Sequence, residues 1–109
     1  MLNHFSQKCS LIVVNYNGRH YLANCLQSIL QLAYPEDLLE IIVVDNGSQD
    51  NSIEFIREQF PQVHLICNPV NSFARALNLG IAKASGQYIG FLNNDATLDR
   101  HWLQVLVDR

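Results

Sequence analysis

Three apolar segments of this 109-residue chain stop at asparagine or aspartate, and this pattern limits the fold more than any other feature. The runs at residues 11–14, 41–44 and 88–92 are followed by Asn15, Asp45 and Asn93. Short apolar runs of this kind are typical of buried strands in a sheet that is covered on both faces. Because ligands of such sheets bind beyond the carboxyl ends of the strands, we expect a polar binding edge there.

Segments with helical periodicity alternate with the strand-like segments. We expect strands at residues 10–15, 40–44, 63–67 and 87–95, the last of them buried, and helices at residues 19–31, 51–60 and 72–84 and after Asp99. This alternation predicts β-α units and a mainly parallel sheet. The fold class is therefore α/β, a Rossmann-like three-layer α/β/α arrangement, and we take residues 1–109 as a single domain.

Two local details can be read from residue types. Asn51 and Glu54 have the spacing of a capping box at the start of the second helix, although Asp50 could be the cap instead. The third helix has the small residues Ala76, Gly80 and Ala84 on one face, so we expect it to lie close against the sheet.

Composition excludes several classes of protein. A net charge of −3 and a pI near 5.7 argue against an electrostatic nucleic-acid binder. The three widely spaced cysteines are interpreted as core residues and free thiols, which favours a cytoplasmic location. The last predicted helix reaches residue 109 without a C-cap, so we expect the chain to be part of something longer, truncated at its C-terminus.

The residues at the predicted edge allow alternative roles. Asp45 could accept a hydrogen bond from a pyrimidine imide N–H or a ribose hydroxyl, or could only cap its own turn. Asp95 could hold a divalent cation such as Mg²⁺ together with a diphosphate, or could lie in a solvated turn. Tyr16 could stack on a base or pack on the first helix, and Arg75 could meet a phosphate or remain solvated.

Several nucleotide-binding classes lack their required motifs here. No G-x-G-x-x-G sequence follows the first strand, and no Walker A motif is present. A receiver domain needs acidic residues after its first strand, where this chain has Asn15 and Asn17. A sugar nucleotidyltransferase needs a loop rich in glycine and lysine at the same place, and this chain has no such loop there.

Four segments together resemble a known family. Residues 10–17, 42–50, 78–80 and 91–95 are similar to the motifs of family 2 glycosyltransferases with the GT-A fold. The Asn93-Asn94-Asp95 version looks most like the rhamnosyltransferase-type branch. The resemblance covers almost the whole chain, in order and with natural spacing, and corresponds to the nucleotide-binding half of that fold.

This resemblance implies a site for a nucleotide-diphospho-sugar, a UDP- or dTDP-sugar, in an enzyme that is expected to invert the anomeric centre. The position of Asp45 binds the base in the family, and Val14, Asn15 and Tyr16 would line the nucleoside. Asn93, Asn94 and Asp95 replace the D-x-D motif. Asn93 and Asn94 would contact the donor, and Asp95 would contact Mg²⁺ or Mn²⁺.

The resemblance also marks what the chain lacks. Asn93 replaces the first aspartate of D-x-D, which lowers the charge next to the cation. From the resemblance we expect the family's acceptor half, with the general base, to lie beyond Arg109, and we expect little turnover by the chain itself. The acceptor would be a saccharide or a lipid-linked molecule; membrane association of the full protein and its oligomeric state stay open. The alternative is a non-catalytic nucleotide-binding or interaction domain on the same scaffold.

Overall fold

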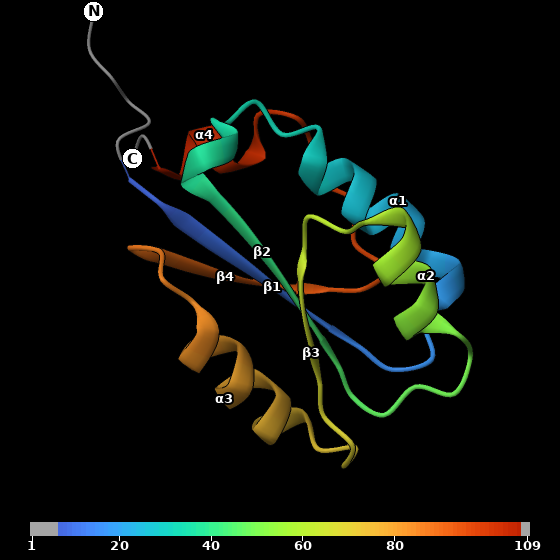
Figure 1. Ribbon diagram of the computed structural model, residues 1–109. Helices are drawn as coiled ribbons and strands as arrows, with labels where there is room; N and C mark the ends of the chain where they lie inside the picture. Colours follow the sequence, from blue (N-terminus) through green and yellow to red (C-terminus); the bar gives the residue numbers. More distant parts are fainter. Residues whose placement is uncertain (1–6, 108–109) are drawn as a thin grey trace, which may run out of the picture.

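Four parallel strands form a sheet with helices on both faces in the computed structural model, which describes residues 7–107 (Figure 1). The strand order is β3-β2-β1-β4, and all three pairings are parallel. The elements are β1 (Cys9–Asn15), α1 (Arg19–Leu30), the 3₁₀ turn η1 (Glu36–Leu38), β2 (Leu39–Asp45), α2 (Ser52–Gln59), β3 (His64–Cys67), α3 (Phe73–Lys83), β4 (Tyr88–Asn93) and α4 (Trp102–Val107). The predicted three-layer α/β/α fold is confirmed.

The central strand β1 builds a core on each face of the sheet, because successive side chains point to opposite sides. Leu11 and Val13 pack with α1, α2 and α4 in the larger core. Ile12 packs with Ala76 of α3 in the smaller core on the other face. Figure 1 shows α1 and α2 on the opposite side of the sheet from α3. Both central strands are buried on both faces, as their apolar runs predict.

The helix α3 lies close to the sheet, as its small residues predict. Ala76 and Gly80 are buried, and a Cβ atom added to Gly80 would lie only 2.7 Å from Cγ2 of Ile12. The larger residues Phe73 and Ile81 of the same helix are 61% and 45% exposed. The small residues therefore define the contact with the sheet, and the large ones lie at its margins.

The prediction of a buried strand at residues 87–95 is wrong in one respect. The strand β4 forms and pairs with β1, but it is the edge strand of the described sheet. Tyr88, Ile89 and Phe91 are each between 41% and 50% exposed. An apolar run indicates that a strand can be buried, but it does not tell which helix or strand packs against it.

A single carboxylate caps the two helices that begin next to β1 and β2. Asp50 Oδ2 accepts a hydrogen bond from the backbone N–H of Arg19 at 3.0 Å, at the start of α1. Asp50 Oδ1 accepts from the N–H of Ser52 at 3.1 Å and from its hydroxyl, at the start of α2. Asn51 makes no side-chain cap bond, so the capping-box alternative is wrong and Asp50 is the cap. Within residues 7–107 no helix is long and apolar enough to cross a membrane.

Candidate functional site

Hydrogen bonds join three strand ends at the carboxyl edge of the sheet. Asn15, at the end of β1, donates from Nδ2 to Asp45 Oδ1 at 3.0 Å, at the end of β2. Asn94, which follows β4, donates from Nδ2 to Asn15 Oδ1 at 2.9 Å. The structure therefore brings together side chains that lie 30 and 79 positions apart in the sequence, as the strand-end pattern predicts.

Asp45 is completely buried, and both of its carboxylate oxygens accept hydrogen bonds within the protein. Its Oδ2 accepts from the backbone N–H of Ser48 at 2.9 Å, across a turn in which Gly47 has φ +88°. The Ser48 hydroxyl oxygen in turn accepts from the N–H of Asn17 at 2.8 Å. A contact between Asp45 and a base stays a prediction, and because Asp45 is fully buried it requires a local change of conformation.

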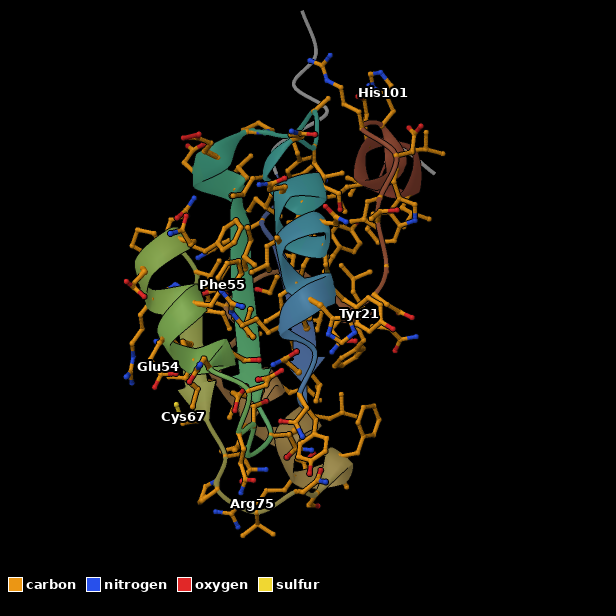
Figure 2. All side chains as sticks on the ribbon, turned by 90° about the vertical axis from the view of Figure 1, so that its right-hand side faces the viewer. Tyr21, Glu54, Phe55, Cys67, Arg75 and His101 are labelled. Carbon is orange, nitrogen blue, oxygen red and sulfur yellow. The ribbon has the colours of Figure 1, made fainter. Side chains whose placement is uncertain are left out.

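A second polar network, outside the predicted set of donor contacts, connects β2 to the loop before α3. Asn68 is buried; it donates from Nδ2 to Asn46 Oδ1 and accepts at Oδ1 from Arg75 Nε at 3.1 Å. Asn46 Nδ2 donates to Asn71 Oδ1 at 2.8 Å. Arg75 thus lies at the carboxyl end of the sheet (Figure 2), exposed and held through its Nε. Sequence patterns place these residues near the edge but do not indicate their pairing.

Near the end of β4, the carboxyl edge of the sheet borders a pocket. A pocket of about 290 Å³ lies between β4, β1 and α3, and Val14, Asn93, Asn94 and Asp95 are among the residues that line it. The Asp95 carboxylate is exposed and accepts no hydrogen bond from residues 7–107. Burial, and then the nearby charge of Asp95, raise the pKa of the Cys25 thiol in α1 to about 11. An open carboxylate next to a pocket can bind a cation or a hydroxyl group.

These donor atoms fit a hard divalent cation only in part. Asp95 supplies a carboxylate, and its neighbours supply amide oxygens, which are the ligand types that Mg²⁺ and Mn²⁺ prefer. Residues 7–107 contain no group of three or more His, Cys, Asp or Glu side chains that could hold a metal. A metal at Asp95 therefore needs further oxygens, such as those of a diphosphate.

Two residues next to this edge have contrasting environments. The Tyr16 side chain is 49% exposed, so its ring is accessible to a ligand. Gly18 is buried, and a Cβ atom added to it would lie 1.9 Å from Asn94 Nδ2. The sequence marks Gly18 only as part of a turn, because close contact with Asn94 depends on the tertiary fold.

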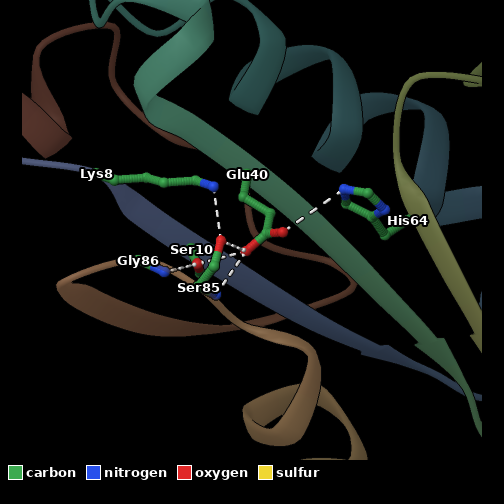
Figure 3. Close-up of polar contacts among 6 residues, drawn as sticks. All are labelled: Lys8, Ser10, Glu40, His64, Ser85 and Gly86. Carbon is green, nitrogen blue, oxygen red and sulfur yellow. Dashed lines mark hydrogen bonds and ion pairs between the residues drawn. The ribbon is translucent and has the colours of Figure 1, made fainter.

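A larger pocket, of about 420 Å³, lies at the amino-terminal edge of the strands. Three carboxylates line it, those of Glu36, Asp37 and Glu40. The Glu40 carboxylate is already used within the protein (Figure 3), since Oε1 accepts from the hydroxyl of Ser10 and the N–H of Ser85. The chain's strand-end amides are all at the other edge. We therefore place the candidate site at the carboxyl edge despite its smaller pocket.

Comparison with known proteins gives consistent matches. The family model described as Glycosyl transferase family 2 matches residues 10–109. The glycosyltransferase AglE of Haloferax volcanii is 34% identical over 100 residues, which cover 87% of this chain and 33% of that protein. The chondroitin synthase of Pasteurella multocida is 31% identical over 93 residues, which cover 83% of this chain and 9% of that protein.

Solved structures show the same architecture. The mannosyltransferase PcManGT from Pyrobaculum calidifontis, in complex with GDP-Man and Mn²⁺, is 28% identical with a TM-score of 0.82, covering 94% of this chain and 31% of that one. TarS of S. aureus in complex with UDP-GlcNAc is 24% identical with a TM-score of 0.80, covering 91% of this chain and 30% of that one, and this likeness concerns the fold. The chain spans about a third of the length of the first curated relatives that it matches.

Proposed function

The chain belongs to glycosyl transferase family 2, and on that premise we propose that it binds the nucleotide-diphospho-sugar donor of a glycosyltransferase. The observation that carries this proposal is the joined carboxyl edge. Asp45, Asn15 and Asn94 form one hydrogen-bonded row, and the open carboxylate of Asp95 follows directly. We propose a UDP- or dTDP-sugar as the donor and a hydroxyl of a saccharide or lipid-linked molecule as the acceptor.

The donor would lie across this edge in a defined order. Its nucleoside would lie near β1 and β2, where Val14, Asn15, Tyr16 and Asp45 are found, with the Tyr16 ring free to stack on the base. Its diphosphate would lie near Asn93, Asn94 and Asp95. The 290 Å³ pocket beside these three residues supports this placement, because it leaves room for part of the sugar diphosphate.

The proposed reaction is a displacement at the anomeric carbon. The acceptor oxygen forms a bond to that carbon from the side opposite the diphosphate, and the bond to the phosphate oxygen breaks, so the configuration inverts. The electron pair of the broken bond leaves on the nucleoside diphosphate, and the acceptor proton passes to a general base. Within residues 7–107 we assign no residue as that base.

A bound Mg²⁺ or Mn²⁺ supplies Lewis-acid stabilisation of the leaving diphosphate. The role of this chain would be to hold the cation through Asp95 and to orient the donor through Asn93 and Asn94. The similarity of the Asn-Asn-Asp sequence to rhamnosyltransferase-type members makes rhamnose the sugar to test first. We also propose a cytoplasmic location, which is supported by the three free cysteines.

Calorimetry tests this proposal with UDP, dTDP and GDP, each with and without Mn²⁺. We expect UDP or dTDP to bind more tightly with Mn²⁺, and Asp95→Asn to remove that difference while leaving the metal-free affinity within about twofold. Asp99→Asn, the same change at an exposed aspartate in the loop before α4, is the control. Tighter binding of GDP than of UDP or dTDP would mean that the donor is a GDP-sugar. Absence of binding by all three nucleotides would overturn the proposed function.

A further inference from the structure

We propose that the buried Asp45 is a positioning residue, which acts through Asn15 to fix the orientation of the Asn94 carboxamide. The three side chains form one relay, with contacts of 3.0 Å from Asn15 Nδ2 to Asp45 and 2.9 Å from Asn94 Nδ2 to Asn15 Oδ1. This inference rests on the proposed function, because it assigns Asn94 its part in donor binding.

The orientation of each amide follows from the chemistry of its neighbour. An ionised carboxylate can only accept hydrogen bonds, so Asn15 must present its NH₂ group to Asp45. Both N–H bonds of that group are used, since Asn15 Nδ2 also donates to the Ser48 hydroxyl oxygen at 3.2 Å. The Asn15 side-chain carbonyl oxygen therefore faces Asn94, and Asn94 must donate to it from its own NH₂ group.

The relay leaves the Asn94 carbonyl oxygen without a hydrogen-bond donor among residues 7–107. Asn94 also lines the pocket next to Asp95. The atom available to a ligand is thus an acceptor. It suits a sugar hydroxyl or the cation that accompanies the diphosphate, and it would not bond directly to a phosphate oxygen. Asp45 would set this preference from a position that no ligand can reach in the present conformation, since its exposure is 0%.

Gly18 provides independent support for the fixed position of Asn94. A Cβ atom at this glycine would lie 1.9 Å from Asn94 Nδ2 and 2.6 Å from Asn15 Oδ1, the two atoms of the second relay bond. The φ of Gly18 is −108°, which other residues also adopt, so its backbone conformation does not require glycine. The need to leave space for the Asn94 amide therefore explains the glycine at position 18.

A double-mutant cycle separates this role from a direct contact with the base. We would measure the affinity for UDP with Mn²⁺ in Asp45→Asn, in Asn94→Ala and in the double variant. An asparagine at position 45 has both a donor and an acceptor, so Asn15 and Asn94 become free to turn over. We expect each single variant to lose about tenfold in affinity, and the double variant to lose no more than the larger single loss. Additive losses of about a hundredfold would overturn the relay.

Nuclear magnetic resonance tests the relay without a ligand, and so keeps it separate from the proposed function. In the unliganded wild type we expect the Asn94 side-chain NH₂ protons to exchange slowly with water. Asp45→Asn and Gly18→Ala should each speed that exchange about tenfold or more. Gly18→Ala reaches Asn94 without altering Asp45, so it decides the matter if Asp45→Asn does not fold. Asn24→Ala, on the exposed face of α1, is the control for chain-wide effects. Rapid exchange of the Asn94 amide in the wild type would overturn the inference even if UDP binds.

Discussion

The Glu40 carboxylate of β2 accepts a hydrogen bond from the Ser10 hydroxyl of β1 at 2.7 Å, at the edge of the sheet opposite the proposed donor site. The same oxygen accepts from the backbone N–H of Ser85 at 2.9 Å, and Ser10 Oγ accepts from the N–H of Gly86 at 2.9 Å (Figure 3). His64 Nε2 lies 3.6 Å from the other carboxylate oxygen. Glu40 therefore ties the connection between α3 and β4 to both central strands.

This arrangement predicts a specific dependence of stability on pH. Burial raises the pKa of Glu40. Hydrogen bonds from Ser85 and Ser10 and the charge of Lys8 lower it by a larger amount, so the net pKa is below its ordinary value. A carboxylate with a lowered folded-state pKa stabilises the protein above its unfolded-state pKa, and this contribution is lost as the pH falls through the folded-state pKa. Glu40→Gln should lose about 1–3 kcal/mol at pH 7 and show a flatter decline in stability below about pH 4.5.

Urea denaturation at several pH values measures both effects for Glu40. Glu58→Gln removes the same charge from the exposed face of α2, and it should change the free energy of unfolding by less than about 0.5 kcal/mol. If Glu40→Gln and the wild type declined in parallel between pH 5 and about pH 3, the carboxylate would not have the role that its contacts indicate.

The sequence predicts the elements and the edge of the sheet that carries polar groups, because strand and helix periods and strand-end residues are local signals. It does not predict the burial of Asp45, since a carboxylate that is enclosed by Asn15 and Ser48 looks the same in sequence as an exposed one. The interpretation of the three cysteines as core residues holds for Cys9 and Cys25 and is wrong for Cys67, which is exposed in the edge strand β3. Contacts between distant segments, such as Gly18 with Asn94, need the tertiary fold.

The shared cap at Asp50 predicts that one substitution weakens two helices. Burial raises the pKa of Asp50. Hydrogen bonds from Ser52 and from the N–H of Arg19 lower it by a larger amount, so the net pKa is below its ordinary value. Asp50→Ala leaves the first N–H groups of α1 and α2 without this acceptor, and should cost about 1–3 kcal/mol in the free energy of unfolding. Asn51→Gly is the matched control, because Asn51 has φ +66° and makes no side-chain cap bond. Equal losses in the two variants would restore the capping-box interpretation.

The close contact between α3 and β1 predicts that alanine is unfavourable at position 80. Helix propensity alone favours Gly80→Ala by about 1 kcal/mol. The new Cβ atom would lie 2.7 Å from Ile12 Cγ2, and overpacking of this kind costs about 1–3 kcal/mol. We expect a net loss of stability in thermal and urea unfolding. Ala82→Gly, at an exposed position of the same helix, measures the propensity effect without the contact. A gain in stability for Gly80→Ala would mean that α3 moves away from the sheet easily.

The three cysteines should differ sharply in reactivity toward a thiol reagent. Cys9 and Cys25 are each 1% exposed, whereas Cys67 is exposed at the end of β3. Because the pKa of Cys25 is raised to about 11, only about one thiol in a thousand at that position is ionised at pH 8. We expect Ellman's reagent to label one thiol rapidly in the native protein and three in urea. Cys67→Ser should remove the rapid phase; a rapid phase that persists in this variant would mean that the α1 face opens on the time scale of labelling, and that the core around Cys25 is less stable than its packing indicates.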